Sequence, residues 1–366
     1  MKNVIKIILT ITLIACGQQN RPQVIDLNLP YTVEEVNFLN HTDGAKLAGT
    51  LIIPKKGKTF PAVILVSGSG LQDRDETVYG HKPFKVLSDY LTRNGIAVLR
   101  YDERSVGKSK GKLSGVTTLD FAEDAYAGIK LLRNYEQINP NKIGIIGHSE
   151  GGLVAAILAE RDSTISFIVL LGSPAVPIDE ALIYSHKNKL RREGKSEEII
   201  DAGANLLSNL FTQIKKGEGY STTKKKLTKI IEKWKSSLTG EAKLDIEEFI
   251  KENPKWFEYI ADEWSTPWWK FLANFDPRDK IRKLRCPVLA LIGKKDIQVN
   301  ADQNLTELKM ALEKGGNKNY RIEYLDDINH LFQKCETGFR EEYAQLDESF
   351  NEDVMKLISD WIHSLK

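Results

Sequence analysis

The 366-residue chain has few cysteines, little net charge and no metal-binding motif, and each shortage excludes a class of protein. Its 3 cysteines form no Cys-x-x-Cys pair and no Cys/His cluster, so the sequence gives no support for a metal site. A formal charge of +2 is too small to favour nucleic acid as a partner, because such binding usually needs a strong basic excess on one face. Apolar residues at 41% and charged residues at 28% are ordinary for a folded globular domain and argue against disorder.

The first fifteen residues differ in composition from the rest. A lysine at position 2 precedes an almost wholly apolar run over residues 4–14, and Leu13-Ile14-Ala15-Cys16 follows. This pattern predicts an export signal over residues 1–15, too short for an ordinary membrane-spanning helix. The ending resembles a bacterial lipobox, in which Cys16 is diacylated and becomes the first mature residue; a plain signal peptide that happens to contain a cysteine is the alternative. We therefore expect a chain that is lipid-anchored to a membrane of the bacterial cell envelope, with residues 16–30 as a polar tether.

Residues 31–366 alternate between short apolar runs and segments of helical periodicity. This alternation predicts an α/β fold with a mostly parallel central sheet and helices on both faces. From about residue 177 to residue 275 the alternation stops and only helical periodicity remains, which predicts a helical cap inserted over one end of the sheet. The expected strands cover residues 33–39, 46–53, 62–66, 96–99, 142–146, 165–171, 287–292 and 321–324.

Ser149 is the candidate nucleophile, and it lies in the segment Gly147-His148-Ser149-Glu150-Gly151. A serine hydroxyl is a weak nucleophile that must stand clear of the backbone, and a sharp strand-to-helix turn achieves this. Such a turn strains the serine backbone and leaves little room for side chains two residues away on either side, where this chain has glycine. An apolar strand before the turn and a small-residue helix after it complete the pattern.

A second Gly-x-Ser-x-Gly segment, Gly107-Lys108-Ser109-Lys110-Gly111, serves as a comparison. It has no apolar strand directly before it and no apolar helix directly after it, so we expect an exposed basic loop around Ser109. It is not a phosphate-binding loop either, because position 102, where the first glycine of that motif would fall, is Asp.

His330 is the predicted base, because it alone among the six histidines follows an expected strand near the C-terminus. For a serine on such a turn, the acid and the base come later in the chain, in loops after later strands. His148 is the immediate neighbour of the serine, and the backbone geometry there points its side chain away from the serine hydroxyl. The remaining histidines are His41, His81, His186 and His363.

Asp296 is the predicted acid, because it follows the apolar run 288–292 and precedes His330 in the chain. Its expected work is to hold the imidazole in one tautomer and to stabilise the imidazolium that forms. Asp302 is the competing acid, although it lies a helical turn into the next element. Asp326 and Asp327 are too near His330 along the chain and are expected to be turn residues.

Two backbone N–H groups are needed as an oxyanion hole, and the chain offers one from each of two loops. The first is the N–H of Glu150, directly after the nucleophile. The second should come from the loop that follows the run 62–66, where Ser69 is the predicted donor; a plain glycine-rich turn is the alternative.

Several segments together resemble bacterial α/β-hydrolase-fold esterases related to the dienelactone hydrolase and serine aminopeptidase branches. The resemblance runs from residue 33 to the end of the chain, and it implies an α/β-hydrolase fold that hydrolyses carboxylic esters without a cofactor. One departure is Ser105, where relatives usually carry Gly after the Asp-x-Arg. The segments are Val66-Ser67-Gly68-Ser69-Gly70, Gln72-Asp73-Arg74-Asp75, Gly95 to Arg104, Gly147 to Gly152 and Asn329-His330-Leu331-Phe332-Gln333.

These residues predict a serine hydrolase that cleaves carboxylic esters of small or medium acyl groups through an acyl-enzyme. The expected partners are a small ester substrate and, through Cys16, a membrane. A serine peptidase, an aminopeptidase or a thioesterase with the same three groups is the alternative within enzymes. A lapsed hydrolase kept as a binding lipoprotein is the alternative of another class, and the intact set of three groups argues against it.

The predicted insertion has two features of its own. Residues 185–235 contain 13 Lys and Arg against 6 Asp and Glu, which fits a solvated helical face or a surface for anionic lipid or substrate. Aromatic residues are dense between positions 256 and 275, where they would build a core or roof an acyl pocket.

Overall fold

A computed structural model describes residues 28–365, so the predicted export signal and Cys16 lie outside the described residues. The chain divides into two compact units, and Val176–Asp276 forms one of them. The strands are β1 (Tyr31–Leu39), β2 (Lys46–Pro54), β3 (Phe60–Val66), β4 (Ala97–Tyr101), β5 (Ile138–His148), β6 (Phe167–Leu171), β7 (Val288–Gly293) and β8 (Tyr320–Leu325). The helices of the sheet-bearing unit are α1 (Pro83–Arg93), α2 (Thr118–Leu132), α3 (Glu150–Arg161), α10 (Pro277–Ile281), α11 (Ala301–Lys314), α12 (Arg340–Tyr343) and α13 (Glu352–Ser364).

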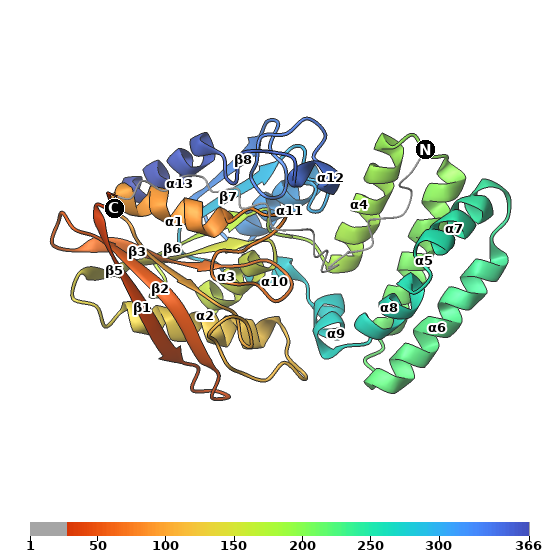
Figure 1. The fold of residues 1–366 in the computed structure, drawn as a ribbon, viewed down its shortest axis with the longest axis horizontal. Helices are drawn as coiled ribbons and strands as arrows, with labels where there is room; N and C mark the ends of the chain where they lie inside the picture. Colours follow the sequence, from red (N-terminus) through yellow and green to blue (C-terminus); the bar gives the residue numbers. More distant parts are fainter. Residues whose placement is uncertain (1–27, 366) are drawn as a thin grey trace. The chain divides into compact units, whose positions relative to one another are not determined.

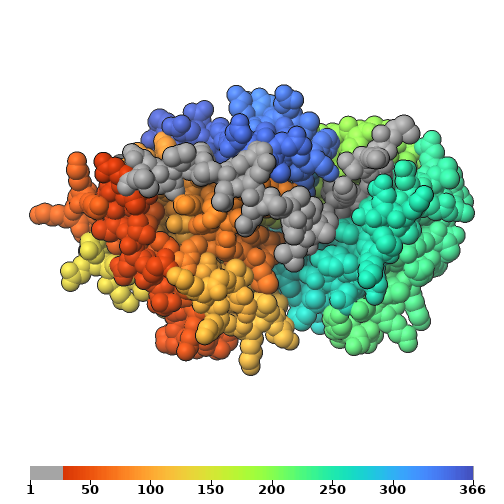
Figure 2. Space-filling model, in the orientation of Figure 1, coloured from red at the N-terminus to blue at the C-terminus, as the bar shows by residue number. Residues whose placement is uncertain are grey.

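All eight described strands form one sheet in the order β1-β2-β4-β3-β5-β6-β7-β8. The hairpin β1–β2 is antiparallel, and β2 also runs antiparallel to β4. Every other neighbouring pair is parallel, from β4–β3 to β7–β8. The first two strands therefore lie at one border of the sheet. Figure 2 shows surface atoms of this part of the chain in red to orange. The predicted mostly parallel α/β architecture is confirmed.

Helices cover both faces of this sheet, which is why its central strands are apolar throughout. On one face, α1 lies beside α13 (Figure 1). Leu87 of α1 and Ile358 of α13 share a buried core with Val63 of β3. On the other face, α2 and α3 pack together, and α10 contacts both α3 and α11. Gly128 brings α2 so close to the sheet that a Cβ there would lie 2.5 Å from Cδ1 of Ile64. Strands enclosed in this way bury their side chains on both faces, as parallel strands generally do.

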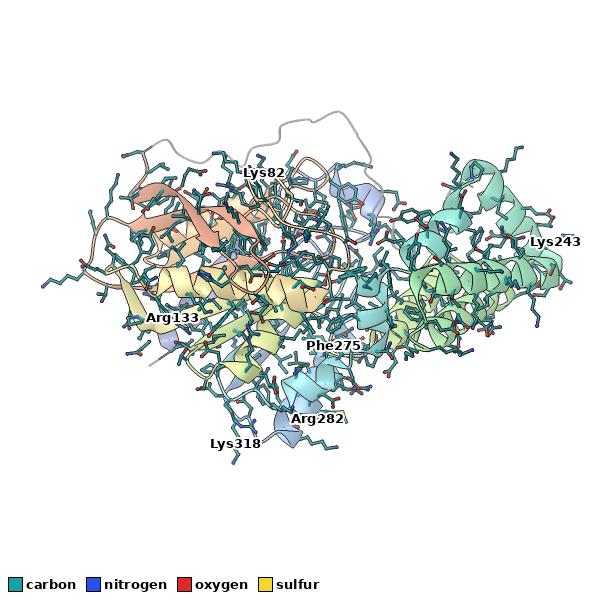
Figure 3. The ribbon with its side chains drawn as sticks, turned by 90° about the horizontal axis from the view of Figure 1, so that it is seen from below. Lys82, Arg133, Lys243, Phe275, Arg282 and Lys318 are labelled. Atoms are coloured by element: carbon teal, nitrogen blue, oxygen red, sulfur yellow. The ribbon has the colours of Figure 1, made fainter. Side chains whose placement is uncertain are left out.

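The unit Val176–Asp276 consists of helices joined by short loops. Its core is rich in aromatic side chains: Trp264 and Trp269 stack with ring centroids 4.5 Å apart, and Trp256 and Phe257 are also buried. Polar side chains such as Lys243 of α7 point away from the helices (Figure 3). That this segment covers one end of the sheet stays a prediction. Its helices are α4 (Ile178–Arg192), α5 (Glu197–Ile214), α6 (Tyr220–Ser237), α7 (Gly240–Glu252), α8 (Trp256–Glu263) and α9 (Pro267–Asn274).

Among residues 28–365, none of the helices has the length and apolar character that a membrane crossing requires.

The close contact between β5 and β6 gives a prediction about stability. A Cβ on Gly144 would lie 2.2 Å from Cε2 of the buried Phe167 ring, so Gly144→Ser should lower the free energy of unfolding by about 1–3 kcal/mol through overpacking. Gly219→Ser is the matched control, because nothing lies within 4 Å of a Cβ at that position. Urea denaturation followed by circular dichroism measures both variants, and equal effects would contradict the expectation.

Candidate active site

The candidate site lies at the C-terminal edge of the parallel strands. Ser149 directly follows β5, Asp296 follows β7 and His330 follows β8. Ser69 belongs to the loop after β3. Because the carboxyl ends of parallel strands meet at one edge of a sheet, residues from four distant parts of the sequence are brought to the same edge, where ligands of α/β sheets bind.

The turn that carries Ser149 is strained and tightly packed. Ser149 has φ 51° and ψ −117°, a backbone conformation that residues other than glycine rarely adopt. A Cβ on Gly147 would lie 2.1 Å from the carbonyl oxygen of Gly151, and a Cβ on Gly151 would lie 2.1 Å from that of Val66. The two glycines are therefore required by the close approach of main chain on either side of the serine. Ser149 itself is half-buried, so its side chain is not sealed in the core.

His330 and Asp296 form a buried pair. Nδ1 of His330 lies 2.7 Å from Oδ2 of Asp296, and the two side chains are 6% and 1% exposed. The other carboxylate oxygen, Oδ1, accepts hydrogen bonds from the N–H groups of Gln298 and Val299, both at 2.8 Å. These bonds fix the carboxylate, so Oδ2 is aimed at the imidazole and holds its Nδ1 in the protonated form.

The three other aspartates that the sequence offered lie apart from this pair. Asp302 is exposed in the first turn of α11. Asp326 and Asp327 have exposed side chains that face Lys294 and Lys295, with N···O distances of 2.7 and 3.9 Å. Asp296 is thus the carboxylate that the structure brings to His330.

The loop around His330 is held by a buried asparagine. Oδ1 of Asn329 accepts the N–H groups of Leu331 and Gln333 at 2.9 and 3.0 Å, and its Nδ2 donates to Oε1 of Gln333 at 3.0 Å. Phe332 adopts φ 61° and stacks on Phe350, with ring centroids 5.3 Å apart. These interactions explain why Asn, Phe and Gln accompany the histidine in this segment.

The end of β6 connects the serine to the histidine. The N–H of Ser149 donates to the carbonyl oxygen of Leu171 at 2.8 Å. The next residue, Gly172, has φ 55°, and a Cβ there would lie 3.2 Å from Nδ1 of His330. Ser149 and His330 therefore each lie against one of two consecutive residues at the end of β6.

The predicted oxyanion-hole loop lies against the serine. A Cβ on Gly68 would be 3.2 Å from Cβ of Ser149. The N–H of Gly68 already donates to Oε1 of Glu76 at 2.8 Å. Ser69 is half-buried, and its N–H has no hydrogen-bond partner among residues 28–365. Glu150 begins α3, and its carboxylate accepts a hydrogen bond from the Thr118 hydroxyl at 2.6 Å.

Side chains from the loop after β4 support the oxyanion-hole loop. Glu103 accepts hydrogen bonds from the Ser67 hydroxyl at 2.7 Å and from the N–H of Gln72 at 3.2 Å. Burial raises the pKa of Glu103 well above its usual range. Arg74 and Asp102 form an ion pair at 2.8 Å that ties the same two loops together.

Two serines in the loop after β4, Ser105 and Ser109, donate hydrogen bonds to main-chain carbonyl oxygens. Ser105 has φ 62°, the left-handed conformation that favours the glycine that the resemblance implied here, and its hydroxyl donates to the carbonyl oxygen of Gly111 at 2.5 Å. The segment around Ser109 is an exposed loop, as the sequence predicts, because Gly107, Lys108 and Lys110 are exposed, but Ser109 itself is buried. Ser109 is 5% exposed, and its hydroxyl donates to the carbonyl oxygen of Asp102 at 2.6 Å. It holds a turn together and stands outside the site.

A second histidine–carboxylate pair was not foreseen. His148 and Glu76 are both buried, and Nδ1 of His148 lies 2.7 Å from Oε1 of Glu76. The sequence carries no local signal for this pair, because 72 positions separate the two residues. In the sequence, Glu76 is marked only by its position directly after Gln72-Asp73-Arg74-Asp75, one of the segments that carry the resemblance.

The described residues contain neither a candidate metal site nor a disulfide. Between residues 28 and 365, no three His, Cys, Asp or Glu side chains are grouped so that they could hold a metal ion. Cys286 and Cys335 are free thiols. Burial raises the pKa of the Cys286 thiol to about 11, so this side chain stays protonated and unreactive at neutral pH.

Comparison with known proteins places the chain among hydrolases. A family model described as serine aminopeptidase, S33, matches residues 82–334. Esterase EstD of Thermotoga maritima is 28% identical over 285 residues, which is 78% of this chain but 58% of that protein. Thiohydrolase aneE of Aspergillus aculeatus is 26% identical over 306 residues, which is 82% of this chain and 86% of that protein. This chain thus spans less than two thirds of the length of EstD.

Solved structures show the same fold at low sequence identity. The Pyrococcus furiosus esterase Pf2001 matches with a TM-score of 0.56 and 16% identity, over 94% of this chain and 97% of that one. DcsB, solved as a complex with its substrate analogue, matches with a TM-score of 0.52 and 16% identity, over 92% and 99% of the two chains. The fold is therefore the α/β-hydrolase fold that the sequence predicted. Because the family model also covers more than half of its length, the chain belongs to the serine aminopeptidase S33 family of α/β-hydrolases.

Proposed function

We propose that the protein is a serine hydrolase that cleaves carboxylic esters through an acyl-enzyme, with Ser149 as nucleophile, His330 as base and Asp296 as the acid that orients the base. The observation that carries the proposal is the buried His330–Asp296 pair, 2.7 Å apart, at the same sheet edge as the strained turn of Ser149. A histidine held by a carboxylate beside an activated serine is the constellation that acyl transfer requires.

In the acylation step, the Ser149 hydroxyl oxygen attacks the carbonyl carbon of the ester. Its proton passes to Nε2 of His330, while Nδ1–H stays on the ring and donates its hydrogen bond to Asp296, whose negative charge stabilises the imidazolium. The carbonyl oxygen becomes an oxyanion that accepts hydrogen bonds from the N–H groups of Glu150 and Ser69. When the tetrahedral intermediate collapses, the C–O bond to the alcohol breaks and Nε2 returns the proton to the leaving alkoxide.

In the deacylation step, the same groups act on water. Neutral His330 takes a proton from a water molecule whose oxygen attacks the acyl carbon, and the bond to the Ser149 oxygen then breaks. The serine oxygen recovers its proton from Nε2, and the carboxylic acid is released. No electron transfer is involved, so the chemistry needs no cofactor.

Small or medium acyl esters are the proposed substrates. The name of EstD supports ester hydrolysis, while the name of aneE supports a thioester as the second candidate. An aminoacyl amide is the third candidate, because the family model is described as an aminopeptidase. Turnover of p-nitrophenyl acetate, an acetyl thioester and an aminoacyl p-nitroanilide under matched conditions separates the three.

Ser149→Ala should fold normally and lose nearly all turnover of p-nitrophenyl acetate, on the order of 10⁵-fold or more in kcat, because the nucleophile is gone. Ser109→Ala is the matched control, since it alters the other Gly-x-Ser-x-Gly segment and removes a buried hydrogen bond outside the site. It should keep its kcat within about twofold. Comparable turnover in the two variants would remove Ser149 from the mechanism.

Asp296→Asn should keep the fold and lower kcat by about a thousandfold or more, because an amide no longer holds His330 in the required tautomer. Asp302→Asn is the control, as this competing carboxylate is exposed on α11. Initial rates at saturating ester give the comparison. If Asp302→Asn abolished turnover while Asp296→Asn cost less than tenfold, the acid would be misassigned.

A lipid anchor at Cys16 is the proposed link to the bacterial envelope, supported by the segment Leu13-Ile14-Ala15-Cys16. Cys16→Ser should therefore move the enzyme from the membrane fraction to the soluble fraction without loss of activity. Cys286→Ser is the control and should stay with the membrane. Retention of Cys16→Ser in the membrane pellet after a salt wash would mean that another segment is the anchor.

A further inference from the structure

His148 and Glu76 form a second buried histidine–carboxylate pair beside the proposed catalytic one. The rings of His148 and His330 lie 4.8 Å apart between centroids, tilted by 44°. Glu76 is 3% exposed and His148 is 6% exposed, so neither is a surface ion pair. The mechanism above uses neither side chain. A buried ionisable pair is costly to desolvate, and its presence next to the reacting groups calls for an explanation.

Both ring nitrogens of His148 face hydrogen-bond acceptors. Nδ1 lies 2.7 Å from Oε1 of Glu76, and Nε2 lies 2.9 Å from the backbone carbonyl oxygen of His330. A carbonyl oxygen can only accept, so Nε2 must carry a proton, and a carboxylate oxygen favours a proton on Nδ1. Both contacts are satisfied when the ring is an imidazolium. Burial acts to lower the pKa of His148, but the charge and hydrogen bond of Glu76 outweigh it and raise the pKa.

The pair connects three loops that must be in register for acyl transfer. Oε1 of Glu76 accepts the N–H of Gly68 at 2.8 Å as well as the His148 ring, so it ties down the loop that precedes Ser69. The other ring nitrogen of His148 holds the main chain of His330 itself. His148 is also the residue directly before Ser149.

The loop that supplies Glu76 is itself under strain. Glu76 has φ 52°, a conformation that costs free energy for a residue with a side chain. It is held by a hydrogen bond from its own N–H to the carbonyl oxygen of Asp73 at 2.9 Å. The two hydrogen bonds that Oε1 accepts offset this strain. Their donors are Gly68, in the loop after β3, and His148, directly before Ser149.

We propose that Glu76 and His148 act as a positioning pair that holds the oxyanion-hole loop and the main chain of the catalytic histidine in register around Ser149. The inference rests on the proposed function, because it assigns these loops their role in acyl transfer. Neither residue touches substrate in this account. They act through Gly68 and His330, and their loss leaves the reacting groups present but misplaced.

The test compares Glu76→Ala, His148→Ala and the double variant in p-nitrophenyl acetate hydrolysis. A misplacement of about 1 Å can cost up to a hundredfold in rate, so each single variant should lower kcat by about tenfold to a hundredfold while KM changes by less than about threefold. Because the two residues act as one unit, the double variant should be no slower than the slower single variant. Thermal unfolding of each variant shows that the enzyme assayed is folded.

Asn40→Ala is the matched control for lost burial and lost hydrogen bonds. Asn40 is 2% exposed and donates to Asp124 at 2.7 Å, in the same unit but outside the site. It should lower the unfolding temperature and leave kcat within about twofold. If Glu76 and His148 had a purely structural role, their variants would likewise unfold at a lower temperature and keep kcat within about twofold.

Glu76→Gln tests the role of the carboxylate charge through the pH dependence of kcat, which a role in packing alone would leave unchanged. The amide oxygen can still accept the N–H of Gly68, so this variant should keep more activity than Glu76→Ala. When His148 loses its proton at alkaline pH, it can no longer donate to both acceptors, so we expect kcat to fall. Loss of the carboxylate charge lowers the pKa of His148, so this fall should begin at lower pH in Glu76→Gln than in the wild type. Besides Glu76, the charge of Asp296 and the backbone carbonyl of His330 raise the pKa of His148, and Glu103 is the titratable group that interacts with Glu76.

The inference is overturned if the single variants keep kcat within threefold of Asn40→Ala, if their losses multiply in the double variant, or if Glu76→Gln has the wild-type pH profile. None of these results touches the proposed function, which stands or falls with the turnover of the wild type and its loss in Ser149→Ala. If the wild type hydrolyses none of the candidate substrates, the proposed function fails, and the role in acyl transfer that is assigned to Glu76 and His148 fails with it.

Discussion

The turn between β5 and α3 leaves no room for a side chain at residue 147 or residue 151, and much of the surrounding structure follows from that contact. Main chain approaches main chain so closely that a Cβ at either position would lie 2.1 Å from a carbonyl oxygen. The serine between the two glycines adopts φ 51° and directly follows the last residue of β5. The helix that follows begins at Glu150, so its first N–H groups and its positive end face the same region.

Hydrogen bonds and close contacts connect the other loops of the site to this turn. Leu171, the last residue of β6, accepts the N–H of Ser149, and Gly172 directly after it lies against the His330 ring. Residues other than glycine with positive φ include Glu76, Ser149 and Phe332, which all lie in loops of the site. Strain of this kind persists only where neighbouring hydrogen bonds and packing over-determine the conformation, as they do here around Asn329 and Glu76.

Much of this arrangement could be predicted from the sequence, because its signals are local. The central strands are continuous apolar runs, and Ser149 has a strand before it, a helix after it and glycines at the required spacing. Asp296 and His330 could be selected by chain order, and the structure brings them together although 34 positions separate them. Their catalytic roles, and that of Ser149, remain the proposal made here.

Other features could not be predicted, for physical reasons. The short helices α10 and α12 are too brief to leave a periodic signal. The burial of Ser109 within an exposed loop could not be predicted, because its flanking lysines are exposed while its own hydroxyl turns inward to the main chain. The Glu76–His148 pair depends on two loops that meet only after the sheet has formed, and a buried ionisable pair has no sequence pattern of its own.

The central claim is that Ser149 is the residue on which the acyl group resides. Its most direct test is to react the folded enzyme with a fluorophosphonate and to locate the adduct by peptide mass spectrometry. The account predicts one adduct per chain, on the peptide that contains Ser149, formed in parallel with the loss of ester turnover. An adduct on another serine, or full loss of turnover without modification of Ser149, would contradict it.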